Sequence, residues 1–317
     1  IPAYNAAAYL DQALASLAAQ THQPAAVVVA DDASTDDTAE RALRWQSLLP
    51  LEVVRLERNM GPGPARHRAI LATDMPLLAI FDADDVLLPD HLEALCTVYE
   101  QATAPEAPGT RVTLATAQEW DWIPHLGIDA DRRRAQPKPI PSNPGEQLRW
   151  VLEANHVTNP LFPRTLYDEV GGFRPELWWG EDWDLWIRMV RAGARVVGTT
   201  HPTLLRRIRS DSMTADSARN AELAVAVATR ALAESQPGAE RRAAQRTLAG
   251  LEARRRYYDA RALAQRGHPW RARLEAAGGL PGASAKVTAG LATMIAAPRF
   301  SLRIEQATRR YRAFSPD

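Results

Sequence analysis

The 317 residues include 38 Lys and Arg against 38 Asp and Glu, and 46% are hydrophobic, an ordinary balance for a soluble globular protein of one large or two smaller domains. The single Cys96 excludes an intrachain disulfide and a zinc site built from several cysteines. No run approaches the ~18 apolar residues that span a bilayer and no signal peptide is visible, so we expect a cytoplasmic protein.

The first hundred residues alternate between helical periodicity and short apolar runs. Ile1-Pro2-Ala3-Tyr4-Asn5 is typical of the end of a strand whose beginning is missing, so we expect a truncated N-terminus. Strands alternating with helices predict an α/β fold with a mostly parallel sheet covered on both faces. The expected strands are 25–30, 51–56 and 76–81, and the expected helices are 8–20, 38–48 and 65–72.

The middle of the chain changes character. Thr103 to Pro144 is rich in proline, contains the basic run Arg132-Arg133-Arg134, and predicts a long, partly mobile connection. Order is expected to return at 145–155 and 158–163. Helices are then predicted at 166–170 and 182–192, and a short strand at 195–198.

From about Ser217 the chain is rich in Ala and Arg and is predicted to be helical, with breaks at Pro237-Gly238, 267–269 and 278–282. Residues 219–317 hold 18 basic and 8 acidic residues, which leaves 20 basic and 30 acidic residues in 1–218. An acidic front part suits a divalent cation. A basic tail suits phosphates, an acidic partner, self-association or the inner face of a membrane, although solvated arginines on helices explain it more simply.

Three carboxylates follow the expected strand at 76–81, in Asp82-Ala83-Asp84-Asp85. Ligands of an open α/β sheet bind at the carboxyl ends of its strands. Neighbouring carboxylates repel one another unless a cation lies among them, and Mg²⁺ or Mn²⁺ bridges carboxylates to a diphosphate. A helix cap would need one acid, so three acids predict a metal and diphosphate site.

Two other loops carry polar groups at strand ends. The acids of Asp31-Asp32-Ala33-Ser34-Thr35-Asp36-Asp37-Thr38 could accept hydrogen bonds from a base or a ribose, while a turn with an N-cap at Asp36 or Asp37 explains part of the pattern. Asn59-Met60-Gly61-Pro62-Gly63-Pro64-Ala65-Arg66 enters a helix. Its glycines permit close approach and Arg66 can reach a phosphate or base, with a purely structural turn as the alternative.

The segment Trp178-Trp179-Gly180-Glu181-Asp182-Trp183-Asp184-Leu185-Trp186 combines four tryptophans with three acids. A sugar site needs a flat face for stacking and a carboxylate that takes a proton. The acids could instead only offset a helix dipole, and we expect Trp186 in the core. We interpret the segment as catalytic, with Trp178, Trp179 and Glu181 on the acceptor side.

Together these motifs resemble glycosyltransferase family 2. The matching segments are Pro2-Ala3-Tyr4-Asn5, Asp31-Asp32-x-Ser34-x-Asp36, Asn59-x-Gly61, Ala65-Arg66, Asp82-x-Asp84-Asp85, Gly171-Gly172-Phe173 and Gly180-Glu181-Asp182. The resemblance covers about 1–215 and implies a GT-A domain there, with a nucleotide-binding half at 1–100 and an acceptor half at 145–215. A helical, basic extension is expected at 216–317.

The resemblance also implies a nucleotide-diphospho-sugar donor, a divalent cation (Mn²⁺ or Mg²⁺) and inversion at the anomeric carbon. It implies that Asp82 faces the ribose, Asp84 the metal, and that Asp182 is the general base toward a hydroxyl of a saccharide, lipid-linked or protein acceptor. No nucleic-acid partner is expected. The implied nucleotide-binding residues are Pro2, Ala3, Tyr4, Asp31, Asp32 and Arg66, together with Asp82.

One departure from the family concerns a His in an Arg-x-His-x-x-Ser segment. The segment Leu205-Arg206-Arg207-Ile208-Arg209-Ser210-Asp211-Ser212 has Ile208 and Arg209 near that place. If that His serves the metal or the diphosphate, Arg206, Arg207 or His201 must substitute for it here. Arginines that neutralise the diphosphate directly would weaken the metal requirement.

Three other functions share part of this pattern. A sugar-nucleotide pyrophosphorylase would show a Gly-rich loop with Arg and Lys near its start, and none is present. A glycosidase also uses paired carboxylates but needs no nucleotide-side motifs. The remaining alternative is a non-catalytic nucleotide-sugar-binding or scaffold protein that works through its basic tail, and Asp84 with Asp182 argues against it because a binder has no use for a base.

Overall fold

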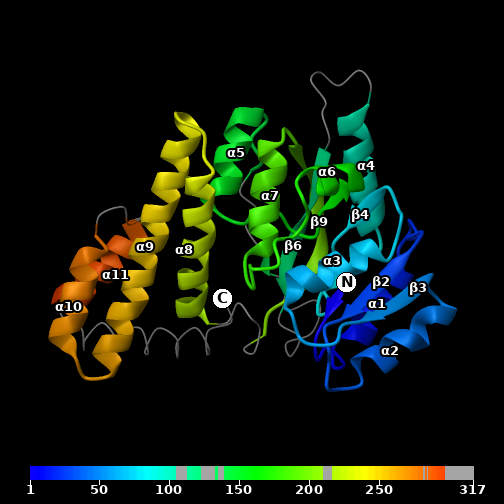
Figure 1. The fold of residues 1–317 in the computed structure, drawn as a ribbon, viewed down its shortest axis with the longest axis horizontal. Helices are drawn as coiled ribbons and strands as arrows, with labels where there is room; N and C mark the ends of the chain where they lie inside the picture. The colour runs from blue at the N-terminus through cyan, green and yellow to red at the C-terminus, as the bar shows by residue number, and fades with distance from the viewer. Residues whose placement is uncertain are drawn as a thin grey trace. The chain divides into compact units, whose positions relative to one another are not determined.

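The computed structural model describes residues 1–104, 113–122, 133–134, 139–209, 216–280, 283 and 285–296. The chain divides into two compact units, Ile1–Ser212 and Met213–Asp317. Figure 1 shows the elements of both and labels many of them. The side chains of the basic run Arg132-Arg133-Arg134, and the stretch Ser210-Asp211-Ser212, lie outside the described residues.

A parallel sheet of β1 (Pro2–Ala3), β2 (Val27–Asp31) and β3 (Leu51–Arg55) opens the first unit. Every residue of the central strand β2 is buried, as expected for an apolar, β-branched run covered on both faces. Val29 packs with the apolar face of α1 (Leu10–Ala18), and Val28 packs with Ala65 and Ala69 of α3 (Pro62–Leu71). Helices therefore cover both faces, as predicted. The helix after β2 is α2 (Thr38–Arg44), which continues as a 3₁₀ turn at Trp45–Ser47.

A second, mixed sheet has the order β4-β8-β6-β9-β5, with β7 beside β6. Only the β6–β9 pair is parallel among its described ladders, and the others are antiparallel. The parallel arrangement expected from the sequence thus applies to the sheet of β1, β2 and β3 and to the pair of β6 with β9. The strands are β4 (Leu77–Ala79), β5 (Val86–Leu87), β6 (Thr113–Trp122), β7 (Arg133–Arg134), β8 (Leu161–Pro163) and β9 (Arg195–Arg207).

The sequence analysis did not predict β6 and underestimated the length of β9. The prediction of a connection throughout 103–144 is wrong for β6, which contains no proline and is buried from Thr113 to Ala117. The short strand expected at 195–198 is wrong in length, since β9 continues to Arg207. Pro202 lies in β9 where the register against β6 shifts, and a bulge of this kind tolerates proline inside a strand.

One helix of the first unit carries the acids of the tryptophan-rich segment, Glu181 and Asp182. The helix α7 (Glu181–Arg191) begins after Gly180, whose φ is +68°, and buries Leu185, Trp186 and Met189. Glu181 and Asp182 stand in the first turn of this helix, and the buried apolar residues fix its orientation. The other helices are α4 (His91–Thr103), α5 (Pro144–Glu153) and α6 (Arg164–Glu169).

The second unit is helical and breaks at the predicted glycines and prolines. Its helices are α8 (Ser217–Ala233), α9 (Ala239–Gln265), α10 (Pro269–Gly278) and α11 (Ala285–Ala296). The long α9 runs beside α8 and α10 (Figure 1). Small side chains such as Ala260 and Ala272 let α9, α10 and α11 pack closely around Leu291. Among the described residues, none of the helices combines the length and the apolar character that crossing a bilayer requires.

Candidate active site

The polar loop after β2 braces the loop after β1. The backbone N–H of Asn5 donates to Ser34 Oγ at 2.9 Å, and the N–H of Thr35 donates to Asn5 Oδ1 at 2.9 Å. Asp36 Oδ1 accepts from the N–H of Thr38 at 3.1 Å, so Asp36 rather than Asp37 caps α2 through its side chain. These bonds hold the segment of Pro2, Ala3 and Tyr4, in which the Tyr4 side chain is exposed and Ala3 is buried.

Asp31 and Asp32 are both buried at the end of β2. Asp32 accepts from the backbone N–H groups of Met60 and Gly61 at 2.8 and 2.7 Å. Burial raises the pKa of Asp32, and these two hydrogen bonds oppose the rise. Asp31 Oδ2 lies 3.4 Å from Arg55 Nε. Asp32 therefore anchors the turn before α3, and its binding of a nucleotide stays a prediction.

The glycines of that turn allow two side chains to lie against it. Gly61 has a φ of +91°, and a Cβ there would lie 3.0 Å from Trp178 Cε3. A Cβ on Gly63 would lie 2.9 Å from Glu181 Cγ. The close approach that the glycines predict is thus made, in this structure, by side chains that flank the start of α7.

Arg66 of α3 is buried and joins the two groups of acids. Its Nη2 lies 2.6 Å from Asp82 Oδ1, and its Nη1 donates to Glu181 Oε1. Burial acts to lower the pKa of Arg66, but the charges of Asp82, Glu181 and Asp182 outweigh it and raise that pKa. Acids from the end of β4 and from the start of α7 therefore meet at one guanidinium. Contact of Arg66 with a nucleotide stays a prediction.

Glu181 is a buried carboxyl group with a side chain only 5% exposed. Burial and the neighbouring charge of Asp182 raise its pKa to about 7, although Arg66 acts in the opposite direction. The aliphatic part of the Glu181 side chain packs against Gly63, and its carboxyl group pairs with Arg66. Glu181 therefore positions Arg66, and any part in acceptor binding would be indirect.

This pKa predicts a pH dependence of stability. A carboxyl group with a folded pKa of about 7 against a usual 4.5 contributes stability below pH 4.5, and that contribution is lost as the pH rises through about 7. At 1.36 kcal/mol per pKa unit the loss is about 3 kcal/mol. We expect Glu181→Gln to lack this part of the slope in urea unfolding followed by tryptophan fluorescence. Equal slopes in the two proteins would contradict the assignment.

Asp182, the second residue of α7, is partly exposed and firmly oriented. Its Oδ2 accepts from Asn155 Nδ2 at 2.8 Å, and its Oδ1 accepts from the backbone N–H of Trp183 at 2.7 Å. Each carboxylate oxygen has two acceptor positions, so both retain one for a substrate. The arrangement suits a carboxylate that accepts a proton. Sequence reasoning missed Asn155, which no motif singles out.

The tryptophan-rich segment separates into a surface part and a core part. Trp178 is exposed and Trp179 is half-buried, as acceptor contacts require. Trp186 lies in the core, as predicted, and so does Trp183, which therefore offers no face for a sugar to stack on. Asp184 is likewise buried, in ion pairs with two arginines of its surroundings.

The loop between β4 and β5 holds three acids with two different roles: one acid is structural and two are accessible. They are Asp85, and Asp82 with Asp84. Asp85 is buried and accepts from the backbone N–H of Arg207 at 3.0 Å, so it anchors the end of β9. The side chains of Asp82 and Asp84 are 39% and 29% exposed and can be reached by a ligand. Burial and the charge of Asp82 raise the pKa of Asp84, while Arg209 opposes the rise.

These two carboxylates fit a divalent cation. They are accessible oxygen donors whose mutual repulsion a hard cation would relieve. Within the described ranges, no group of three or more His, Cys, Asp and Glu side chains could hold a metal ion by itself. The remaining ligands of such a cation would therefore come from diphosphate oxygens and water.

The arginines at the end of β9 are held by protein groups. Arg206 Nη2 lies 2.5 Å from Asp121 Oδ1. Arg207 Nε donates to the backbone oxygen of Asp84 at 2.7 Å. Arg209, which sequence reasoning did not assign, places Nη2 3.1 Å from Asp84 Oδ2. The signal for it was its place at the His of the Arg-x-His-x-x-Ser pattern. The predicted contact of Arg206 and Arg207 with a diphosphate stays a prediction.

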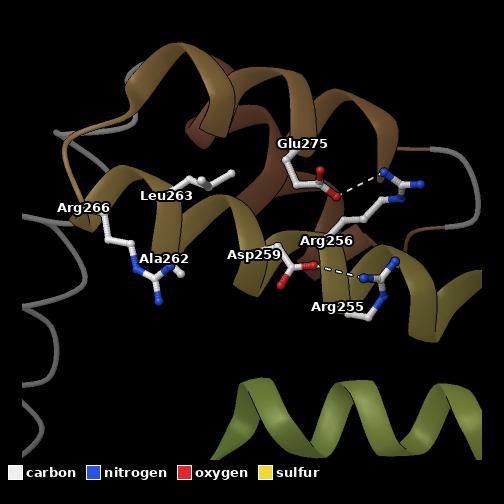
Figure 2. A pocket seen from close by; sticks show the side chains of 7 residues that line it. All are labelled: Arg255, Arg256, Asp259, Ala262, Leu263, Arg266 and Glu275. Carbon is white, nitrogen blue, oxygen red and sulfur yellow. Dashed lines mark hydrogen bonds and ion pairs between the residues drawn. The ribbon is translucent and has the colours of Figure 1, made fainter.

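The basic helical unit has a hollow of its own on α9 and α10 (Figure 2). Arg255 and Arg256, which line it, form ion pairs with Asp259 and Glu275 at 3.1–3.2 Å. These two arginines of the basic extension are thus paired within the unit.

An α/β unit with acids at a strand end and at a helix start, joined by one arginine, is the arrangement of a candidate glycosyltransferase of the GT-A class. The sequence model of the family Glycosyl transferase family 2 matches residues 1–167. The chain belongs to this family and is a glycosyltransferase.

Curated relatives include the amylovoran biosynthesis glycosyltransferase AmsE of Erwinia amylovora, 28% identical over 205 residues that cover 64% of this chain and 71% of that protein. The succinoglycan biosynthesis protein ExoU of Rhizobium meliloti is 32% identical over 210 residues, 62% of this chain and 57% of that protein. The match to ExoU thus spans less than two thirds of its length.

Solved structures of similar fold include S. aureus TarS residues 1–349 in complex with UDP-GlcNAc. Its TM-score is 0.60 at 17% identity, covering 98% of this chain and 90% of that one. The mannosyltransferase PcManGT of Pyrobaculum calidifontis, in complex with GDP-Man and Mn²⁺, has a TM-score of 0.59 at 20% identity, covering 96% and 82%. At these identities the likeness establishes the fold, which confirms the GT-A prediction.

Proposed function

We propose that the chain transfers one sugar, with inversion, from a nucleotide-diphospho-sugar to an acceptor hydroxyl during polysaccharide biosynthesis. The observation that carries the proposal is the Arg66 bridge, because Asp82 and Glu181 pair with one guanidinium. This bridge supports a shared site for the strand-end acids and for Asp182, which follows Glu181 in the chain. The names of AmsE and ExoU support the polysaccharide context, and the donors bound to TarS and PcManGT support the donor class.

The chemistry is a single displacement. Asp182 takes the proton of the acceptor hydroxyl while that oxygen attacks the anomeric carbon from the side opposite the diphosphate. The new carbon–oxygen bond forms as the bond to the diphosphate breaks, and the nucleoside diphosphate leaves with the electron pair. Asn155 and the N–H of Trp183 hold the carboxylate in place during the transfer.

A divalent cation on Asp84, with Asp82 beside it, would supply positive charge for the departing diphosphate. The Mn²⁺ in the PcManGT structure supports a cation in this role. Asp82 is in turn fixed by Arg66. We place the acceptor near Trp178 and Trp179, which are the accessible tryptophans of the α7 segment.

Donor binding tests this proposal by thermal shift with UDP, GDP, ADP and dTDP, each with and without Mn²⁺. At ~100 times its dissociation constant, the preferred nucleotide should add about 2.7 kcal/mol of stability. Asp84→Ala should lose the part of the stabilisation that Mn²⁺ adds. The control Asp168→Asn, at an exposed carboxylate of α6, should keep it. If no nucleotide stabilises the protein with Mn²⁺, the proposed function is wrong.

A further inference from the structure

We propose that Arg209 is a cation supplied by the protein for the donor diphosphate, so that nucleoside diphosphates bind this enzyme even without a divalent cation. The inference rests on the proposed function and deepens it. It assigns Arg209 as a diphosphate-binding residue at the end of β9, next to the carboxylate that we propose as the metal ligand.

Arg209 and Asp84 form an accessible ion pair. Arg209 Nη2 lies 3.1 Å from Asp84 Oδ2, and the two side chains are 22% and 29% exposed. A diphosphate that reaches a cation on Asp84 must therefore also reach the guanidinium of Arg209. Because a guanidinium presents N–H groups in a planar fork, it suits phosphate oxygens as well as it suits a carboxylate.

A stack of rings and guanidinium groups fixes the place of Arg209. Its Cζ lies 4.5 Å from the centroid of the Tyr9 ring. Arg207 lies 5.1 Å from the same ring and 4.3 Å from the ring of Trp122. Arg207 is anchored in turn, since its Nη2 donates to Gln12 Oε1 at 2.6 Å. The Tyr9 ring thus has a rigid support, and cation–π attraction holds Arg209 at the edge of the site.

The charge of the site explains why such a cation is needed. A diphosphate approaching Asp82 and Asp84 is repelled by both carboxylates. Arg66 is buried and divides its guanidinium between Asp82 and Glu181. Arg209 is instead partly exposed and paired with the carboxylate that a divalent cation would occupy. Without that cation, Arg209 offsets the charge of Asp84 and is the positive charge that the diphosphate meets; when the cation is bound, the cation takes over most of this role.

The test compares the dissociation constant of the nucleoside diphosphate selected by thermal shift in EDTA and in Mn²⁺, by calorimetry. Wild-type protein should bind in EDTA. Arg209→Ala should bind about 10- to 150-fold more weakly there, as for loss of a hydrogen bond to a charged group, and should lose much less in Mn²⁺. Arg209→Lys should retain an intermediate affinity in EDTA because it keeps the charge. The control Arg149→Ala removes an exposed arginine paired with Glu153 and should change neither value.

Three results would contradict the assignment of Arg209 as a diphosphate-binding residue. If wild-type protein binds only with Mn²⁺, or if Arg209→Ala binds as tightly as wild type in EDTA, Arg209 does not serve the diphosphate. Equal weakening in EDTA and in Mn²⁺ would reveal a merely structural arginine, and Arg209→Lys would then behave like Arg209→Ala. In all of these cases binding in Mn²⁺ still supports the proposed function, so the two failures are distinguishable.

Discussion

Asp182→Asn should lower the turnover number by ~10²–10⁴-fold and leave donor binding intact, because positioned general-base catalysis contributes about that much. The substitution changes no volume and keeps an oxygen for the N–H of Trp183. Asn155 can rotate its amide to accept from the new Nδ2, so the local structure is preserved. The loss in turnover number should therefore be due to the missing general base and not to a changed local structure.

Transfer rates and nucleotide affinity measured on the same preparation check this expectation. Asp168→Asn is the matched control, since it removes an exposed carboxylate of α6. Full activity in Asp182→Asn would remove Asp182 from the chemistry. Equal losses in turnover and donor affinity would make it a structural residue.

Arg66→Ala should destabilise the first unit by about 3–5 kcal/mol at pH 8, the cost of breaking a buried ion pair from one side. The variant leaves the buried Glu181 without the guanidinium that pairs with it. Since burial already raises the pKa of Glu181 to about 7, the cost should shrink at pH 5.5, where that carboxyl group is protonated.

Urea unfolding followed by tryptophan fluorescence measures this loss, because eight of the nine tryptophans lie in 1–212. The double variant Arg66→Met with Glu181→Met should recover much of the stability by replacing the pair with apolar side chains. The exposed pair of Arg149 with Glu153 provides the control, and Arg149→Ala should cost at most about 1 kcal/mol. A loss of that small size in Arg66→Ala would show that the bridge does not hold α3 to α7.

The regular elements with strong local signals were predictable. The β-branched run of β2, the Leu10 and Leu14 face of α1, and the breaks at Pro237-Gly238 all appear where the sequence places them. The strand β6 and the full length of β9 were not, because a central strand with polar residues depends on its neighbours. In β6 only Thr113 to Ala117 are fully buried in succession, and this pattern becomes visible only beside β9.

The sequence by itself determined the family, the class of chemistry and the acids that could carry it, because Asp84 and Asp182 stand in short motifs whose spacing is local. Only the tertiary structure decided how those motifs meet. Arg66 bridges Asp82 and Glu181, and Arg209 pairs with Asp84, because the sheets and α7 fold distant segments onto one another. Ion pairs and burial depend on distances through space, which no pattern along the chain specifies.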